Sequence, residues 1–180
     1  LAAEKGWADF ERASKTSGSG FYFLKGNLVL LDLALQRFAI DLLSSRGFTP
    51  VIPPFMINRK SYEEVTDLND FENVMYKIDG DDAYLIATSE HPIAAMFQDE
   101  IFEEKDLPIR LAGLSPCFRR EIGSHGLDTK GLFRVHQFFK VEQFVYCKPE
   151  QSWEIHEELR ENAEDVFKQL KLPYRVVNIC

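Results

Sequence analysis

Two stretches of alternating residues, about 109–122 and 132–146, constrain the fold of this chain more than any other feature. In residues 132–146 every second side chain is mostly apolar, a period that indicates a β-strand with two different faces. The loop between the two stretches, 123–131, is polar and contains three glycines. A polar, glycine-rich connection between two strand patterns is typical of a hairpin. We therefore expect a long antiparallel strand pair here.

The remaining segments predict helices and further strands. Residues at helical spacing predict a helix from Leu28 to Arg46 that Gly47 ends: Leu31, Ala34, Leu35, Phe38 and Leu42. Residues 48–57 are apolar, but three prolines exclude them from a central strand. The other expected elements are a short helix within 1–20, a hairpin of strands 74–78 and 84–88, helices 92–102 and 150–170, and a last strand 174–179. This mixture predicts an α+β fold with a largely antiparallel β-sheet flanked by helices.

Composition excludes several classes of protein. The chain has 15 Phe, 6 Tyr and 2 Trp in 180 residues, too many aromatic side chains for a disordered segment. There is no run of 18 apolar residues and no basic, apolar leader, so we expect a cytoplasmic protein without a membrane span. Three widely spaced cysteines and four scattered histidines argue against a disulfide framework and a zinc site. The missing initiator Met and the apolar final residues indicate a fragment.

Charge is unevenly distributed along the chain. The net charge is −8, yet residues 110–140 carry six basic and two acidic side chains, whereas residues 61–106 carry two basic and fourteen acidic ones. A basic island in an acidic chain is a candidate site for a polyanion such as a nucleotide or an RNA end. An ordinary mixed surface is the simpler explanation of the charges taken alone.

The polar face of residues 132–146 is unusual for a solvated strand face. Five side chains follow one another on it: Arg134, His136, Phe138, Lys140 and Glu142. An aromatic ring between cations, with a carboxylate beyond, suits a stacked base, a phosphate and an amine. On the preceding strand, Arg119 and Glu121 also share a face. A ladder of cross-strand ion pairs explains the same residues without a ligand, so both interpretations stay open from the strand alone.

Together these residues resemble the class II aminoacyl-tRNA synthetases and, within them, the seryl-tRNA synthetases of archaeal type. Motif 2 of that family is an F-R-x-E sequence, a loop and a strand, matched here by Phe118-Arg-Arg-Glu121 and by residues 133–142, FRVHQFFKVE. Motif 1, a helix followed by a glycine and a proline-containing segment, is matched by residues of about 28–57, with Pro54 in the motif position. The seryl T-x-E loop is matched by Thr88-Ser-Glu90. Several motifs in the family's order are more specific than any one pattern.

The resemblance implies a class II catalytic core that activates L-serine with ATP to seryl-adenylate and transfers the serine to tRNA(Ser). In that family the motif 2 arginine, here Arg119, is the catalytic residue that clamps the α-phosphate and the serine carboxylate. ATP would be held by Arg119, Arg120, Glu121, Val135 and Phe138. The ring of Phe138 would stack on adenine, and Mg²⁺ would bridge phosphate oxygens.

The same resemblance assigns the amino-acid and tRNA contacts. Serine would be held by Thr88, Ser89, Glu90, Arg119 and Glu142. Buried Glu90 and Glu142 would suit a pocket that must read the serine hydroxyl, because a polar site rejects analogues that lack it. His125 and Lys130, in the loop between the two motif 2 strands, would contact the acceptor end of the tRNA.

Simpler explanations stay open for single residues. Thr88, Ser89 and Glu90 would serve equally well as the cap of the helix that follows them. Arg119 and Glu121 would serve as a surface ion pair. Histidines 91 and 136 are expected to be structural, since the implied chemistry needs no general base from them.

The resemblance further implies a single partial catalytic domain over residues 1–180. Motif 1 lies at about 28–57, the T-x-E loop at 88–90 and motif 2 at about 109–146, without the N-terminal tRNA-binding coiled coil and without motif 3. Such a piece leaves a sheet edge and an apolar face exposed, so we expect a homodimer through the motif 1 region, or aggregation. Two other functions stay open: an adenylate-forming homologue that charges a carrier protein, and a non-enzymatic nucleotide-binding or dimerisation remnant.

Overall fold

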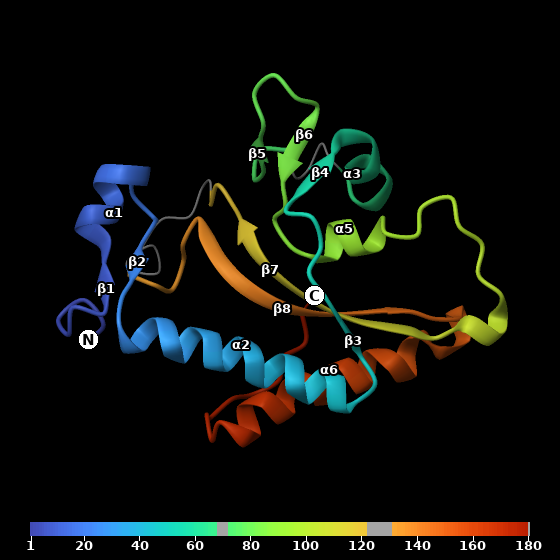
Figure 1. Ribbon diagram of the computed structural model, residues 1–180. Helices are drawn as coiled ribbons and strands as arrows, with labels where there is room; N and C mark the ends of the chain where they lie inside the picture. Colours follow the sequence, from blue (N-terminus) through green and yellow to red (C-terminus); the bar gives the residue numbers. More distant parts are fainter. Residues whose placement is uncertain (68–71, 122–130, 180) are drawn as a thin grey trace.

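A long antiparallel strand pair runs through the centre of the fold (Figure 1). The computed structural model describes residues 1–67, 72–121 and 131–179. Strand β7 (Ile109–Phe118) pairs antiparallel with β8 (Gln137–Tyr146) over their whole length, from Ile109 opposite Tyr146 to Phe118 opposite Gln137. Strand β3 (Thr49–Val51) lies parallel to β7 on its other side, at the edge where Pro50 is tolerated.

A second, smaller sheet lies beside the first one. Strand β6 (Ala83–Leu85) pairs antiparallel with both β4 (Met56–Asn58) and β5 (Tyr76–Lys77), which confirms the predicted hairpin. Helix α3 (Arg59–Val65) follows β4, and its Tyr62 is fully buried against Tyr84. Arg59 joins α3 to β6 and the turn before it, since its guanidinium donates to Asp82 at 3.0 Å and to the Tyr84 hydroxyl at 2.8 Å. The predicted α+β fold with largely antiparallel sheets is therefore confirmed.

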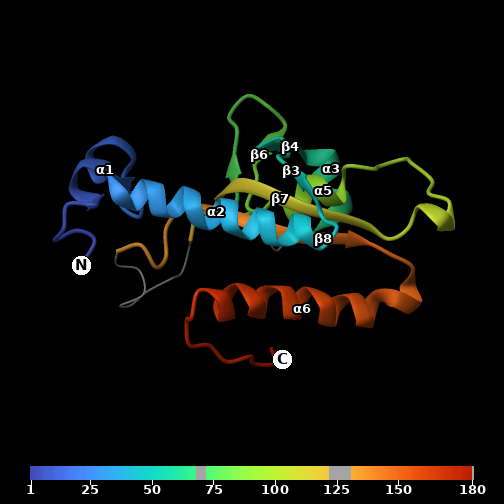
Figure 2. The same cartoon turned by 60° about the horizontal axis from the view of Figure 1, so that its bottom comes forward.

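Two long helices cover one face of the main sheet (Figure 2). The two longest predicted helices are confirmed, as α2 (Asn27–Ser45) and α6 (Ser152–Gln169). A short 3-10 turn (Pro149–Gln151) precedes α6. The core between the two helices and the sheet consists of Leu43, Phe48 and Ala112, with Ile40, Val141, Val145 and Leu159 packed around it. Arg46, at the end of α2, donates hydrogen bonds to Asn162 and Asp165 of α6, so the two helices are joined by polar contacts as well.

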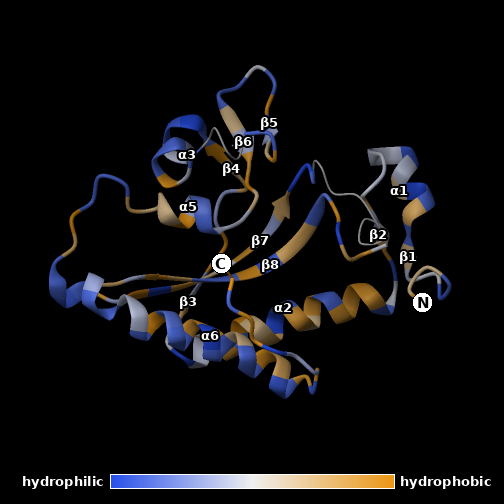
Figure 3. Ribbon diagram, turned by 180° about the vertical axis from the view of Figure 1, so that it is seen from behind, coloured by the Kyte–Doolittle hydropathy of each residue, from blue (hydrophilic) through white to orange (hydrophobic). Residues whose placement is uncertain are grey.

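The apolar stripe that predicts α2 is only partly covered by the rest of the chain. Leu31 and Leu35 of the stripe are 53% and 40% exposed, whereas its Phe38 and Leu42 are partly buried. Leu30 and Leu33, outside the stripe, are 65% and 54% exposed. Figure 3 shows the resulting run of hydrophobic residues along α2. Ile40 and Leu43, on another side of the helix, make the contact with the core. Helical spacing therefore gives the helix correctly, but this helix has more than one apolar side.

Three predicted boundaries are wrong. The strand predicted over 109–122 ends at Phe118, because the Arg120 N–H donates to the Val74 carbonyl and Glu121 has a φ of +50°. Its partner begins at Gln137 rather than at residue 132. The helix predicted over 92–102 is only α5 (Glu90–Ala94), since the chain then turns and Phe97 packs on Phe102 and Tyr146, with ring centroids 5.0 and 5.3 Å apart.

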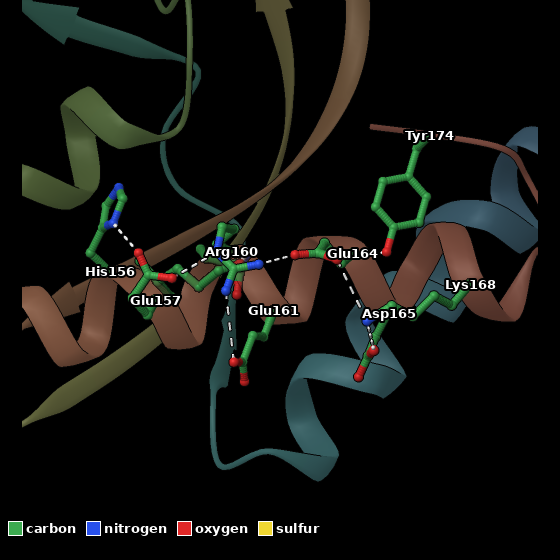
Figure 4. A network of polar contacts seen from close by, with 10 residues as sticks. His156, Glu157, Arg160, Glu161, Glu164, Asp165, Lys168 and Tyr174 are labelled. Atoms are coloured by element: carbon green, nitrogen blue, oxygen red, sulfur yellow. Dashed lines mark hydrogen bonds and ion pairs between the residues drawn. The ribbon is translucent and has the colours of Figure 1, made fainter. Parts of the chain in front are cut away.

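The prediction of a last strand over 174–179 is also wrong. No described strand lies beside these residues, and the segment is extended without a ladder. It returns along α6 instead, where the Tyr174 hydroxyl donates to Glu164 at 2.6 Å (Figure 4). Glu164 belongs to a chain of ion pairs on the same helix that includes Arg160 and Lys168. The C-terminal segment is therefore attached to a charged helix face rather than to a sheet.

Helix α5 lies on the face of the main sheet opposite α2 (Figure 1). It approaches β7 at Gly113, where an added Cβ would lie 2.6 Å from Ile93 Cδ1 and 2.7 Å from Ser89 Oγ. Gly113 is paired with Glu142 of β8, so this close approach places the start of α5 next to the middle of the strand pair. The glycine therefore allows residues 88–90 to lie close to the polar face of β8.

The N-terminal residues form a small unit around helix α1 (Phe10–Ser17), with strand β1 (Ala8–Asp9) paired antiparallel to β2 (Phe23–Leu24). Asp9 is buried and caps α1, accepting a hydrogen bond from the Arg12 N–H at 3.0 Å. The side chains of Arg12 and Lys25 donate to its other carboxylate oxygen at 2.6 and 3.1 Å. The Arg12 backbone hydrogen bond, helped by these two cations, holds the pKa of Asp9 well below its usual range.

Asp9→Asn should therefore change how stability depends on pH. The unfolded carboxyl takes up a proton near pH ~3.9, whereas the folded one stays ionised to lower pH, so the native chain loses this stabilisation as the pH falls below about 4. We expect Asp9→Asn to unfold at a lower temperature than the native chain at pH 7, and the difference to shrink toward pH ~2. Thermal unfolding of the native chain and of Asp9→Asn between pH 7 and pH ~2 measures this difference. Asp81→Asn, in the exposed turn between β5 and β6, is the control. A difference that is constant down to pH ~2 contradicts this role for Asp9.

Candidate active site

Arg119 lies one residue beyond the end of β7, where several elements meet. Its backbone N–H donates to the His136 carbonyl at 2.9 Å, which continues the pairing with the other strand. Its guanidinium Nε donates to the Ala87 carbonyl at 3.2 Å, and the guanidinium carbon lies 5.3 Å from the centre of the Phe138 ring. The side chain is therefore held between the segment after β6 and the polar face of β8.

Two cavities meet at Arg119. The first, of about 320 Å³, is lined by Val65, Thr66, Val74, Met75, Ala87, Thr88, Glu90, His91, Ala94 and Arg119. The second, of about 390 Å³, is lined by Arg119, Glu121, Leu132, Phe133, Arg134, Val135 and Phe138. Of the residues predicted to hold serine, Thr88, Glu90 and Arg119 line the first cavity. Of those predicted to hold ATP, Arg119, Glu121, Val135 and Phe138 line the second.

The T-x-E loop is joined directly to β8. Thr88 is buried, and its hydroxyl donates to a Glu142 carboxylate oxygen at 3.1 Å. The same hydroxyl accepts from Lys140 Nζ at 2.6 Å and from the Glu90 N–H at 3.2 Å. Thr88 therefore contacts the Glu142 carboxylate and also accepts from the first N–H of α5, although the N-cap residue of that helix is Ser89, whose side chain makes no capping bond.

Lys140 is a site residue that the sequence assignments missed. It forms an ion pair with Glu142 and donates to Thr88, so its ammonium lies between the loop and the strand. The signal was present, because Lys140 falls between Phe138 and Glu142 on the polar face of the strand. The pattern alone does not distinguish a site residue, because a lysine close to a glutamate on a strand is also typical of an ion-pair ladder.

The two carboxylates predicted to be buried differ in their surroundings. Glu142 is paired with Lys140 and is 23% exposed, so it is only partly buried rather than buried as predicted. Glu90 is exposed at the rim of the first cavity, so the prediction that it is buried is wrong. Glu90 is the first residue of the short helix α5, and its side chain is exposed to solvent. Ser89, between the two loop residues, is fully buried with its Oγ against Gly113, beneath the loop.

The second cavity brings together most of the residues predicted for ATP. Val135 is buried, Phe138 is partly buried, and Glu121 accepts a hydrogen bond from Arg134 Nε. Glu121 and Arg119 lie beyond the end of β7 rather than on one face of it, but both still line this cavity. Arg120 is exposed, and its backbone is tied to Val74. The residues predicted to contact tRNA, His125 and Lys130, lie outside the described residues.

The two histidines near the site differ. His136 is bound to Arg119, with its Nδ1 2.8 Å from the Arg119 carbonyl oxygen, which agrees with a structural role. His91 lies on the wall of the first cavity, its ring 4.8 Å from that of Tyr62, and its Nδ1 has no partner among the described residues. Burial, together with the nearby cations Lys140 and Arg119, lowers the pKa of His91 to about 4, so it is neutral at pH 7.

Neither a metal centre nor a membrane segment is found in the parts that the structure describes. There, no group of three or more His, Cys, Asp or Glu side chains is arranged to hold a metal ion. Nor is any helix of that part both long and apolar enough to cross a membrane.

Comparison with known proteins identifies the family. Residues 73–180 match the tRNA synthetase class II core domain (G, H, P, S and T). The chain is 82% identical over all 180 residues to the serine–tRNA ligase of Methanospirillum hungatei, of which it covers 42%. A crystal structure of seryl-tRNA synthetase from Pyrococcus horikoshii complexed with ATP matches 99% of the chain, with a TM-score of 0.96 and 58% identity, over 40% of its own length.

A second solved structure agrees. The cytoplasmic serine–tRNA ligase of Naegleria fowleri, in complex with AMP, matches 99% of the chain with a TM-score of 0.94 and 44% identity, over 42% of its own length. The chain thus spans about two fifths of the length of the relatives that it matches. The motifs, the two cavities that meet at Arg119 and the family match agree, and the chain belongs to the class II tRNA synthetase core-domain family.

Proposed function

We propose that this chain is a partial catalytic domain of a serine–tRNA ligase, residues 1–180 carrying motif 1, the T-x-E loop and motif 2. The observation that carries the proposal is the position of Arg119 on the wall of both cavities. A residue that must hold an amino-acid carboxylate and a phosphate at once has to lie between the two binding sites. A guanidinium suits this task because its planar fork binds carboxylate and phosphate groups with paired hydrogen bonds.

The reaction follows from these positions. L-serine lies in the first cavity, its ammonium toward Glu142 and Glu90, while Thr88 and Ser89 shape the floor. ATP lies in the second cavity, with adenine on Phe138, Val135 and Glu121 beside it and Arg120 at the rim. A serine carboxylate oxygen attacks the α-phosphorus, the P–O bond to the β-phosphate breaks, and pyrophosphate leaves with that electron pair. Arg119 stabilises the charge that develops on the α-phosphate oxygens.

The second half of the reaction uses tRNA(Ser). A hydroxyl of the tRNA 3′ end attacks the serine carbonyl carbon, the hydroxyl proton is lost, and AMP leaves. The loop that carries His125 and Lys130 connects the two strands of the site, and we assign it the contact with the acceptor end. Mg²⁺ bound with ATP supplies further charge neutralisation at the phosphates. We place this activity in the cytoplasm.

The apolar side of α2 supports a homodimer. Leu31 and Leu35, which share one side of this helix, are 53% and 40% exposed, and burial of a leucine side chain contributes about 1.5–3 kcal/mol. We predict that the chain sediments as a dimer at micromolar concentration, and that Leu31→Glu with Leu35→Glu makes it a monomer. Sedimentation equilibrium measures this. Leu170→Glu with Leu172→Glu, a matched pair at the end of α6, is the control and should leave the dimer intact; dissociation by both pairs alike contradicts the assignment.

Because the chain covers 42% of its relative, activity is best measured in a full-length context. In a full-length chimera, residues 1–180 replace the matching segment of the Methanospirillum hungatei protein. We expect serine-dependent exchange of labelled pyrophosphate into ATP. Charging of tRNA(Ser) then separates this function from an adenylate-forming homologue that charges a carrier protein, and nucleotide binding without exchange indicates a non-enzymatic remnant.

Arg119→Lys in the chimera should lower the exchange rate roughly a hundredfold to a thousandfold, because one ammonium cannot make the paired bonds of a guanidinium. Arg160→Lys, in the ion-pair network of α6 far from the cavities, should leave the rate unchanged. Steady-state exchange kinetics measure both variants. An Arg119→Lys enzyme with near-native activity excludes this mechanism.

The two cavities should be separable by their substrates. Glu142→Gln should raise KM for serine at least tenfold with little change in KM for ATP, because it removes the carboxylate that faces the ammonium. Phe138→Leu should do the reverse, since base–aromatic stacking contributes about 1–3 kcal/mol. Exchange measured with serine and ATP varied in turn gives the two KM values. If either variant changes KM for serine and KM for ATP equally, the cavities are wrongly assigned.

A further inference from the structure

His136 holds the backbone of Arg119 from two sides. Its carbonyl accepts from the Arg119 N–H at 2.9 Å, and its ring Nδ1 lies 2.8 Å from the Arg119 carbonyl oxygen. A carbonyl oxygen only accepts, so Nδ1 carries the proton and donates this bond. Both backbone polar groups of Arg119 are therefore bound by one residue.

The ring of His136 lies in a space that the N-terminal segment leaves open. The His136 N–H donates to the Gly20 carbonyl at 3.0 Å, and the Phe21 ring lies 5.2 Å from the imidazole. A Cβ on Gly20 would lie 2.4 Å from His136 Cδ2 and 2.7 Å from Nε2. Real side chains do not approach so closely, so the imidazole keeps this position only because residue 20 is a glycine.

We propose that His136, seated against Gly20, is a positioning residue for Arg119, and that the N-terminal segment thereby controls the catalytic arginine. From its fixed backbone the Arg119 side chain reaches the Ala87 carbonyl and the face of Phe138, which sets the guanidinium between the two cavities. The expected loss of activity rests on the proposed function. The hydrogen bonds of His136 and its close approach to Gly20 do not depend on that function. Gly20 itself lines neither cavity described above.

The chain offers a matched pair of glycines for the test. Gly20 and Gly18 both have positive φ, +82° and +93°, so an alanine is strained at either position. An added Cβ at Gly18 meets no atom within 4 Å, whereas one at Gly20 collides with His136. The difference between Gly20→Ala and Gly18→Ala therefore isolates the displacement of the imidazole from backbone strain.

The experiment measures exchange kinetics and thermal unfolding of the full-length chimera with these substitutions. Gly20→Ala should lower kcat roughly tenfold to a hundredfold relative to Gly18→Ala, because a displacement near 1 Å costs up to about 10²-fold. His136→Ala should lower kcat similarly, and His136→Asn, whose amide can donate in place of Nδ1, should recover part of it. In the His136→Ala background, Gly20→Ala should cost no more than Gly18→Ala, since the methyl group then has room.

Crystal structures of the two glycine variants supply a readout that needs no activity. The distance from Arg119 Nε to the Ala87 oxygen should lengthen in Gly20→Ala and stay near its native 3.2 Å in Gly18→Ala. Equal kcat values for the two variants, losses that multiply with His136→Ala, or an unmoved guanidinium each overturn the inference. If the unsubstituted chimera has no exchange activity, the proposed function fails, and the crystal structures alone decide the positioning role.

Discussion

The pairing of β7 with β8 is the interaction on which the site depends. Its register places Gly113 opposite Glu142 and Phe118 opposite Gln137, so Arg119 follows at the end where β8 begins. A shift by one residue would turn Phe138, Lys140 and Glu142 to the other face of the sheet, away from the T-x-E loop. The partly buried Val141 and Val145 pack against the core beneath α2 and α6, and this contact fixes the register because it needs the opposite face of β8. The apolar core thus selects the polar face that carries the chemistry.

The site is completed by parts of the chain that are distant in sequence. Thr88 reaches Glu142 because Gly113 allows α5 to approach the sheet closely. Arg119 donates to the Ala87 carbonyl, its backbone is bound by His136, and Gly20 leaves room for the His136 ring. In both places a glycine leaves room for a neighbouring side chain, and in both places that side chain lies next to a predicted functional residue. Close approach, rather than loop flexibility, is what these two glycines provide.

Much of this arrangement could be predicted from local patterns. Period two in residues 132–146 separates Lys140 and Glu142 from Val141 and Val145 correctly, and the turn at 79–82 gives the hairpin. Tertiary effects account for the failures. The apolar spacing of α2 does not show which side of the helix packs within the chain. The helix predicted over 92–102 is shortened because Phe97 packs on Phe102 and Tyr146. Residues 174–179 have strand-like composition, but a strand needs a neighbour, and none is present in the described part of the chain.

In the proposed mechanism Arg119 joins an amino-acid site to a nucleotide site. This role is tested most directly by a crystal structure of the full-length chimera with a non-hydrolysable analogue of seryl-adenylate. We expect the adenine against Phe138, the seryl group in the cavity beside Thr88 and Glu142, and the guanidinium of Arg119 on the group that replaces the phosphate. An analogue bound with its seryl group outside that cavity, or without contact to Arg119, would contradict it.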